Sequence, residues 1–227
     1  MPIFYMPGDE KEFWNFVNEV LQIKGKKILD IGAGEKAQSA HKMIEYGGNV
    51  TILDNNKDRL DKQNIPGIFG DASHIPLPDG SYDLVTTFSA LHEMPAEIHS
   101  KVIREMKRVG KTVAIFEGYN APVNEEEKKL LDLAKELASS VGEVEKPMPK
   151  EYWLSLLKES GIEAKSWDLE LVFEENANEK QIRKGVEESC KSRGYPQDLT
   201  EAFVKQLLKV RELKGKESKH CFLILGL

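Results

Sequence analysis

Apolar residues along the chain follow two spacings, one typical of buried strands and the other of amphipathic helices. Short apolar runs rich in β-branched and aromatic residues predict seven strands, at 26–32, 49–54, 67–71, 82–88, 111–117, 165–173 and 220–225. Apolar positions three and four residues apart predict helices at about 9–23, 36–46, 56–63, 95–109, 124–140, 149–160 and, with a break at 194–196, 178–214. Since strands and helices alternate as far as residue 117, we expect an α/β fold with a doubly wound, mostly parallel sheet.

The same pattern predicts how the 227 residues are organised. We expect one domain, 1–227, because domains of about 100–200 residues are usual and a larger one can carry an appendage. The alternating strands and helices would form a core at 24–120, followed by a helical region at about 122–160. A helical insertion at about 177–217 would then precede the last strand.

Charge is distributed unevenly along the chain. The net charge is −6 at pH 7, whereas residues 176–220 carry 11 Lys and Arg and 7 Asp and Glu, a local charge of +4. An acidic chain is not typical of proteins that bind nucleic-acid backbones, so we expect no nucleic-acid partner. An anionic partner, if there is one, would bind the basic insertion.

The cysteines and the hydropathy of the chain indicate in which cellular compartment we expect the protein. Cys190 and Cys221 belong to no Cys/His cluster, so we expect neither a disulfide framework nor a metal site. No apolar run approaches the ~18–20 residues that span a bilayer, and the first residues lack the pattern of a signal peptide. We therefore expect a cytoplasmic protein without a membrane partner.

The most informative segment is the glycine-containing turn at 30–37, between the first predicted strand and the next helix. Gly32 and Gly34 let the backbone turn tightly and let a ligand approach the main chain. Asp54 ends the second strand 20 positions after Gly34, where a carboxylate commonly accepts hydrogen bonds from ribose hydroxyls. The pattern predicts a nucleoside-cofactor site at the carboxyl edge of the sheet, although such glycines can also serve packing alone.

Two cofactor classes fit this turn. Gly32-x-Gly34-x-x-Ala37 satisfies the dinucleotide fingerprint, so an NAD(P)-dependent oxidoreductase is one alternative. However, Asp30 would repel a pyrophosphate placed beside the turn. S-adenosyl-L-methionine carries an ammonium and a sulfonium, which a carboxylate attracts, and we therefore favour it.

The chain resembles the class I S-adenosylmethionine-dependent methyltransferases, in particular the small-molecule group of ubiquinone and menaquinone biosynthesis, over about 25–118. Four segments in the family's order carry the resemblance: the D-x-G-x-G motif at 30–34, Asp54, the G-D-A-x-x-L-P-like segment at 70–78, and the Y-D-x-V strand at 82–85. One departure is Lys36, where the family often has a third glycine. The resemblance implies a seven-stranded Rossmann-like methyltransferase fold with a helical insertion before the last strand.

The resemblance also implies which residues bind the cofactor. The D-x-G-x-G backbone would hold the methionine part, Asp54 the ribose and Asp71 the adenine amino group. The candidate cofactor-binding residues are Asp30, Gly32, Ala33, Gly34, Asp54, Asn55, Asp71, Ala72 and Ser89.

His92 follows the fourth predicted strand, where the family often has a histidine near the transferred methyl group. It is the candidate catalytic residue, because it could accept a proton from the methyl acceptor, although it could instead cap the next helix. Glu93 is a weaker candidate. The spacing from His92 to His99 does not match the H-E-x-x-H zinc motif, so we expect no metal. Tyr5 and Tyr119 could cover the substrate pocket.

The hypothesis is an enzyme that transfers the S-adenosylmethionine methyl group to a small molecule by in-line displacement. Three alternatives stay open: a protein or RNA substrate, an NAD(P)-dependent oxidoreductase, and a non-catalytic module that binds an adenosyl cofactor. The segment at 88–91 lacks the N-P-P-Y sequence associated with methylation of nucleobases and glutamine. The acceptor and the oligomeric state are not predicted.

Overall fold

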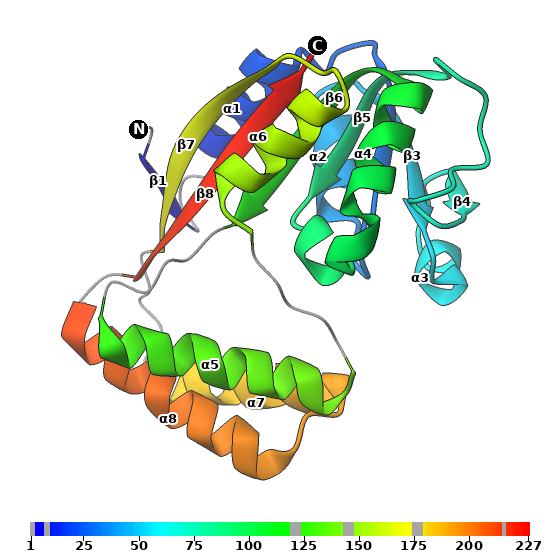
Figure 1. Ribbon diagram of the computed structural model, residues 1–227. Coiled ribbons are helices and arrows are strands. Elements are labelled where there is room, and N and C mark those ends of the chain that lie inside the picture. Colours follow the sequence, from blue (N-terminus) through cyan, green and yellow to red (C-terminus); the bar gives the residue numbers. More distant parts are fainter. Residues whose placement is uncertain (1–2, 7–9, 119–123, 143–147, 174–178, 215–216) are drawn as a thin grey trace.

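A single sheet of eight strands organises the computed structural model, which describes residues 3–6, 10–118, 124–142, 148–173, 179–214 and 217–227 (Figure 1). The spatial order of the strands is β1-β7-β8-β6-β5-β2-β3-β4. Their bounds are β1 Ile3–Met6, β2 Lys27–Ile31, β3 Asn49–Asp54, β4 Gly67–Phe69, β5 Tyr82–Phe88, β6 Gly110–Gly118, β7 Ala164–Phe173 and β8 Glu217–Gly226. Only β8 runs against its neighbours, so the sheet is mostly parallel, as expected.

The helices lie close to the positions expected from the apolar spacing. They are α1 Glu10–Leu21, α2 Gln38–Glu45, α3 Lys57–Asp61, α4 Ala96–Val109, α5 Glu125–Ser140, α6 Lys150–Glu159, α7 Glu179–Arg193 and α8 Gln197–Lys214, with a short 3₁₀ turn η1 at Leu91–Glu93. No helix in these described ranges is long and apolar enough to cross a membrane.

The seven expected strands are all present, in the order of the Rossmann-like methyltransferase fold. An eighth strand, β1, extends the sheet at one edge and was not predicted. It has only four residues and pairs in parallel with β7, from Ile3 beside Glu170 to Met6 beside Phe173. A four-residue run at a chain end is too short to show a periodic pattern, which is why the apolar spacing did not reveal it.

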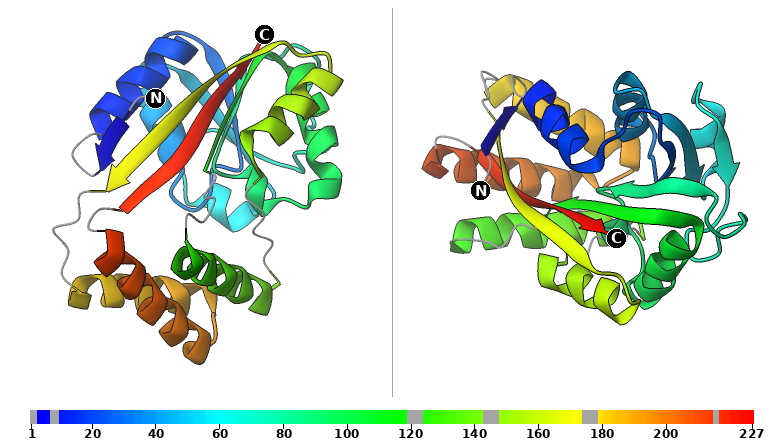
Figure 2. Two further views of the ribbon diagram at one scale, coloured as in Figure 1. Left: turned by 60° about the vertical axis from the view of Figure 1, so that its left-hand side comes forward. Right: turned by 90° about the horizontal axis from the view of Figure 1, so that it is seen from above.

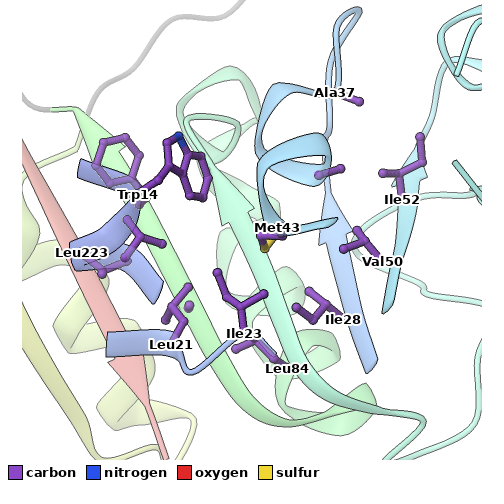
Figure 3. Close-up of a cluster of buried hydrophobic side chains, with 14 of the residues drawn as sticks. Trp14, Leu21, Ile23, Ile28, Ala37, Met43, Val50, Ile52, Leu84 and Leu223 are labelled. Carbon is purple, nitrogen blue, oxygen red and sulfur yellow. The ribbon is translucent and has the colours of Figure 1, made fainter. Parts of the chain in front are cut away.

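Two hydrophobic clusters hold the helices against opposite faces of the sheet. Figure 3 shows the first, which α1 and α2 build against β2, β3, β5 and β8; its labelled members include Trp14, Leu21, Ile23, Ile28, Met43, Val50, Ile52, Leu84 and Leu223. The second joins α4 and α6 to the other face, with Val102, Ile103, Met106, Trp153 and Leu157 fully buried. Removal of each such side chain from water contributes about 1.5–3 kcal/mol to stability. The two clusters therefore fix the helices against the two faces of the sheet.

The alternation along β2 places a charge in the first cluster. Ile28 belongs to the α1–α2 face, and Leu29 and Ile31 belong to the opposite face. Asp30 therefore points to the same side as Ile28, and its side chain is only 1% exposed. A carboxylate at a core position requires hydrogen-bond donors, which the site supplies.

Helices α5, α7 and α8 form a separate layer beyond the edge of the sheet where β6 and β7 end and β8 begins (Figures 1 and 2). Glu126 of α5 joins that helix to α8, because it accepts a hydrogen bond from Gln206 Nε2 at 2.9 Å and pairs with Lys209 at 2.9 Å, and α7 packs on α8. Helix α6 instead packs against α4 and the sheet. The helical layer thus lies on the side of the sheet that carries the loops after the parallel strands.

Candidate functional site

The turn between β2 and α2 has a backbone that requires glycine. Gly32 has φ +70° and Gly34 φ +69°, in the left-handed region that L-residues avoid. A Cβ on Gly32 would lie 2.7 Å from Ala90 Cβ, while a Cβ on Gly34 would meet nothing within 4 Å. The Gly32 amide donates to the Leu53 carbonyl at 2.8 Å, which fixes the turn against β3. Ala33, between the glycines, packs on the first hydrophobic cluster.

Asp30 lies beneath this turn. Ser39 Oγ donates to its Oδ2 at 2.6 Å, and Thr86 Oγ1 donates to its Oδ1 at 2.8 Å. Burial raises the pKa of Asp30 to about 6, and the two hydroxyl hydrogen bonds oppose that rise. The carboxylate thereby connects β2 to α2 and β5.

A pocket opens at the carboxyl ends of β2 and β3. Five of the candidate cofactor residues line it: Gly32, Asp54, Asn55, Asp71 and Ala72. The other lining residues are Ile31, Leu53, Arg59, Gly70, Ala90, Glu93, Met94, Pro95 and Ile98. At about 160 Å³ the pocket is smaller than the roughly 300–1,000 Å³ of sites for drug-sized ligands, which suits the nucleoside part of a cofactor.

The two aspartates of the pocket are oriented by their own loops. Asp54 is 4% exposed, and its Oδ1 accepts a hydrogen bond from the Asn56 amide at 2.8 Å. Asp71 Oδ1 accepts from the Ser73 amide at 2.7 Å, and this bond is the main reason why the pKa of Asp71 is lowered. Such turns fix a carboxylate relative to the backbone, so both groups are preorganised to accept hydrogen bonds from a ligand.

Beside the pocket, His92 contacts the buried carboxylate of Glu117. Glu117 is the penultimate residue of β6, is 1% exposed, and has its Oε2 2.7 Å from His92 Nδ1. Its Oε1 accepts from the backbone amides of Ala90 and Leu91 at 3.1 and 2.8 Å. Because a carboxylate only accepts hydrogen bonds, His92 Nδ1 carries the hydrogen that points to Glu117, which leaves Nε2 as the basic nitrogen of the neutral ring.

The structure therefore distributes the candidate residues over four places. Five line the pocket, Asp30 is buried without lining it, and His92 is on the η1 turn, two residues after pocket-lining Ala90. Ala33, Gly34 and Ser89 lie on the adjoining turns, and Ser89 has a left-handed φ of +51° that is rare for a residue with a side chain. Tyr119 and the side chain of Tyr5 lie outside the described residues.

Two charged residues of the site were missed. Glu117 had a sequence signal, since it is the one acid at the end of the apolar run 113–116, in the strand after His92. Arg59 had no such sequence signal, because a single cation in the short helix α3 is typical of a solvent-exposed helix position. In the part of the chain that the structure describes, no group of three or more His, Cys, Asp or Glu side chains could hold a metal ion.

Comparison with known proteins agrees with the geometry. Residues 29–116 match a family model described as a methyltransferase domain. The chain is 36% identical over 116 residues to an uncharacterized methyltransferase of Synechocystis sp., a segment covering 48% of this chain and 54% of that protein. It is 35% identical over 98 residues to the demethylmenaquinone methyltransferase of Listeria welshimeri, covering 38% of this chain and 41% of that protein. The matches thus span about half or less of the length of these curated relatives.

A solved structure extends the likeness to nearly the whole fold. The YcgJ protein of Bacillus subtilis superposes with a TM-score of 0.66 at 18% identity, covering 96% of this chain and 98% of that one. The matched family uses S-adenosylmethionine as its cofactor. Residues 29–116 are thus similar in sequence to a methyltransferase domain, with distant similarity to the menaquinone and ubiquinone enzymes, and the whole chain has the Rossmann-like methyltransferase fold.

Proposed function

We propose that this protein transfers the methyl group of S-adenosylmethionine to a nucleophile of a small-molecule acceptor. The observation that carries the proposal is the meeting of Gly32, Asp54 and Asp71, from three separate loops, in one pocket beside His92. Asp54 would hold the ribose hydroxyls, and Asp71 the adenine amino group. The turn of Gly32 and Gly34 would let the methionine part approach the backbone.

The charge of the pocket favours this cofactor over a dinucleotide. Three carboxylates line it, Asp54, Asp71 and Glu93, against the single guanidinium of Arg59. Such a lining attracts a ligand that carries a sulfonium and an ammonium, and it repels a pyrophosphate. The residues present therefore fit S-adenosylmethionine, which when bound supplies an electrophilic methyl group on a good leaving group.

The His92–Glu117 pair supports an acceptor that loses a proton as it is methylated. His92 Nε2 would take the proton from a hydroxyl or amine, and the Glu117 carboxylate, 2.7 Å from Nδ1, would stabilise the resulting imidazolium. General-base assistance of this kind contributes about 10²–10⁴-fold to rate. Alignment of the acceptor with the methyl group can supply about 7–11 kcal/mol more of the barrier.

The likeness to the Listeria demethylmenaquinone methyltransferase supports a small-molecule acceptor. A protein or RNA acceptor would instead need an extended surface leading to the pocket. The acceptor screen should therefore include phenolic, enolic and amine metabolites together with bulk RNA and protein, each assayed with the radiolabelled methyl donor.

Cofactor binding is tested first, by titration calorimetry with S-adenosylhomocysteine and with NADH. We expect S-adenosylhomocysteine to bind and NADH not to bind; the reverse result would refute the proposal.

The Asp54→Ala variant should raise the Kd for S-adenosylhomocysteine about 10- to 150-fold, because hydrogen bonds to a charged group contribute about 1.5–3 kcal/mol. Asp58→Ala is the matched control, since Asp58 is exposed on the adjacent helix and does not line the pocket. Cofactor binding without methyl transfer to any acceptor would favour a non-catalytic module.

A further inference from the structure

We propose that His99 is a positioning residue that holds the turn carrying His92; the proposal rests on the function proposed above. His99 lies in α4 and its side chain is 0% exposed. Its Nε2 is 3.0 Å from the Leu91 carbonyl and 3.0 Å from the Met94 carbonyl, and its Nδ1 is 2.9 Å from the Tyr152 hydroxyl.

These contacts determine the tautomer of His99. Two carbonyl oxygens can only accept, so Nε2 carries the hydrogen and donates it to both. Nδ1 then accepts from the Tyr152 hydroxyl, which remains a donor because burial raises the pKa of Tyr152. The ring is also fixed by packing, with centroid distances of 4.7 Å to Trp153 and 5.7 Å to Tyr152.

The turn is thereby held from two sides. Glu117 accepts from the amides of Ala90 and Leu91, at the start of the turn. His99 donates to the carbonyls of Leu91, the first residue of the turn, and Met94, which directly follows its last residue. His92 lies between these two attachments.

The same turn borders the cofactor pocket, since Ala90, Glu93 and Met94 line it. One short segment therefore sets the distance between the methyl donor and the base. A displacement of about 1 Å in such an arrangement can cost about 10²-fold in rate. Fixing this segment is a role that a buried histidine filling space would not have.

Two variants of similar polarity separate these roles. In His99→Gln the amide nitrogen reaches the position of Nε2 and can still donate to the two carbonyls. In His99→Asn the amide ends near the position of Nδ1 and cannot reach them. Tyr152→Phe is the control, because it removes the hydroxyl but leaves the two carbonyl contacts in place.

The experiment combines steady-state kinetics with ¹⁵N NMR of histidine-labelled protein. For His99→Asn we expect kcat to fall about 10- to 100-fold with a much smaller change in KM, and the exchange-protected Nδ1–H signal of His92 to weaken. For His99→Gln and Tyr152→Phe we expect kcat within about threefold of wild type and the signal retained. An unchanged His99→Asn variant, or a His99→Gln variant equally impaired, overturns the proposal.

A measurement on the wild type alone guards against a variant that does not fold. The NMR spectrum should show His99 with hydrogen on Nε2; hydrogen on Nδ1 alone would overturn the proposal. Neither NMR readout needs methyl transfer. If no acceptor is ever methylated, the proposed function fails, while the spectra still decide whether His99 holds the turn.

Discussion

Replacing Gly32 with alanine should destabilise the fold more than the same replacement at Gly34, although the φ angles of the two residues are nearly identical. Gly32 has φ +70° and Gly34 φ +69°, so the conformational strain of a new side chain is the same at both. Their surroundings differ, because only the Cβ on Gly32 would lie 2.7 Å from Ala90 Cβ. The pair therefore separates backbone strain from steric overlap.

The magnitudes follow from these two contributions. Left-handed backbone costs an L-residue about 1–2 kcal/mol, which is the expected loss for Gly34→Ala. An added methyl group in a filled space costs about 1–3 kcal/mol more. Gly32→Ala should thus lower the free energy of unfolding by about 2–5 kcal/mol, and the difference between the variants should be about 1–3 kcal/mol.

Urea denaturation followed by circular dichroism measures this difference. With a slope of about 2 kcal/mol per molar urea, the midpoint of Gly32→Ala should lie about 0.5–1.5 M below that of Gly34→Ala. Adding Ala90→Gly to Gly32→Ala removes the overlapping methyl group and should recover most of the difference, less the roughly 0.5–1 kcal/mol that glycine itself costs. Equal midpoints for the two single variants, or no recovery in the double variant, would refute the steric argument.

Three further predictions concern buried groups. Asp30 has a folded pKa of about 6, above the unfolded value of about 3.9, so the folded state binds its proton more tightly and stability falls as pH rises through this window. Asp30→Asn should therefore gain up to about 3 kcal/mol relative to wild type between pH 4 and pH 7 in paired urea titrations, and parallel curves would contradict this. Ser39→Ala removes a hydrogen bond that lowers this pKa, so the upper end of the window should move to higher pH. Glu117→Gln should lower kcat about 10²–10⁴-fold, because the amide favours the other His92 tautomer; normal kcat with unchanged cofactor affinity would exclude His92 as the base.

Local pattern predicted most of the elements because each depends on neighbouring residues. The spacing that predicted a helix at 95–109 corresponds to α4 at Ala96–Val109, whose buried face recurs every three or four residues. The glycines of the turn were equally visible, since Gly32 and Gly34 carry the motif and both have a positive φ. The D-x-G-x-G motif alone does not indicate the environment of Asp30. The alternation of side chains along β2 places it on the same buried face as Ile28.

Long-range pairing accounts for what the pattern could not reveal. Strand β8 lies between β6 and β7 and is antiparallel to both, through hydrogen bonds between segments that are distant in the sequence. The spacing of apolar residues within one segment does not indicate such pairing. The Glu117–His92 contact joins residues 25 positions apart, and Gln206 reaches Glu126 across 80. Each of these contacts is specified by the folded sheet rather than by its own segment.

The antiparallel pairing of β7 and β8 makes this protein suited to the exchange of whole segments. Phe173, the last residue of β7, pairs with Glu217, the first of β8, so the chain leaves and re-enters the sheet within about 5 Å. In topological terms residues 174–216 are one long hairpin connection. The strand order does not depend on the length of this connection, because any segment that joins these two neighbouring positions preserves the pairing of β7 with β8. Under the proposed function, selectivity for the acceptor can then diversify, by evolution or by grafting, while the carboxyl ends of β2, β3 and β4 and the loops after them, which carry Gly32, Asp54 and Asp71, stay as they are.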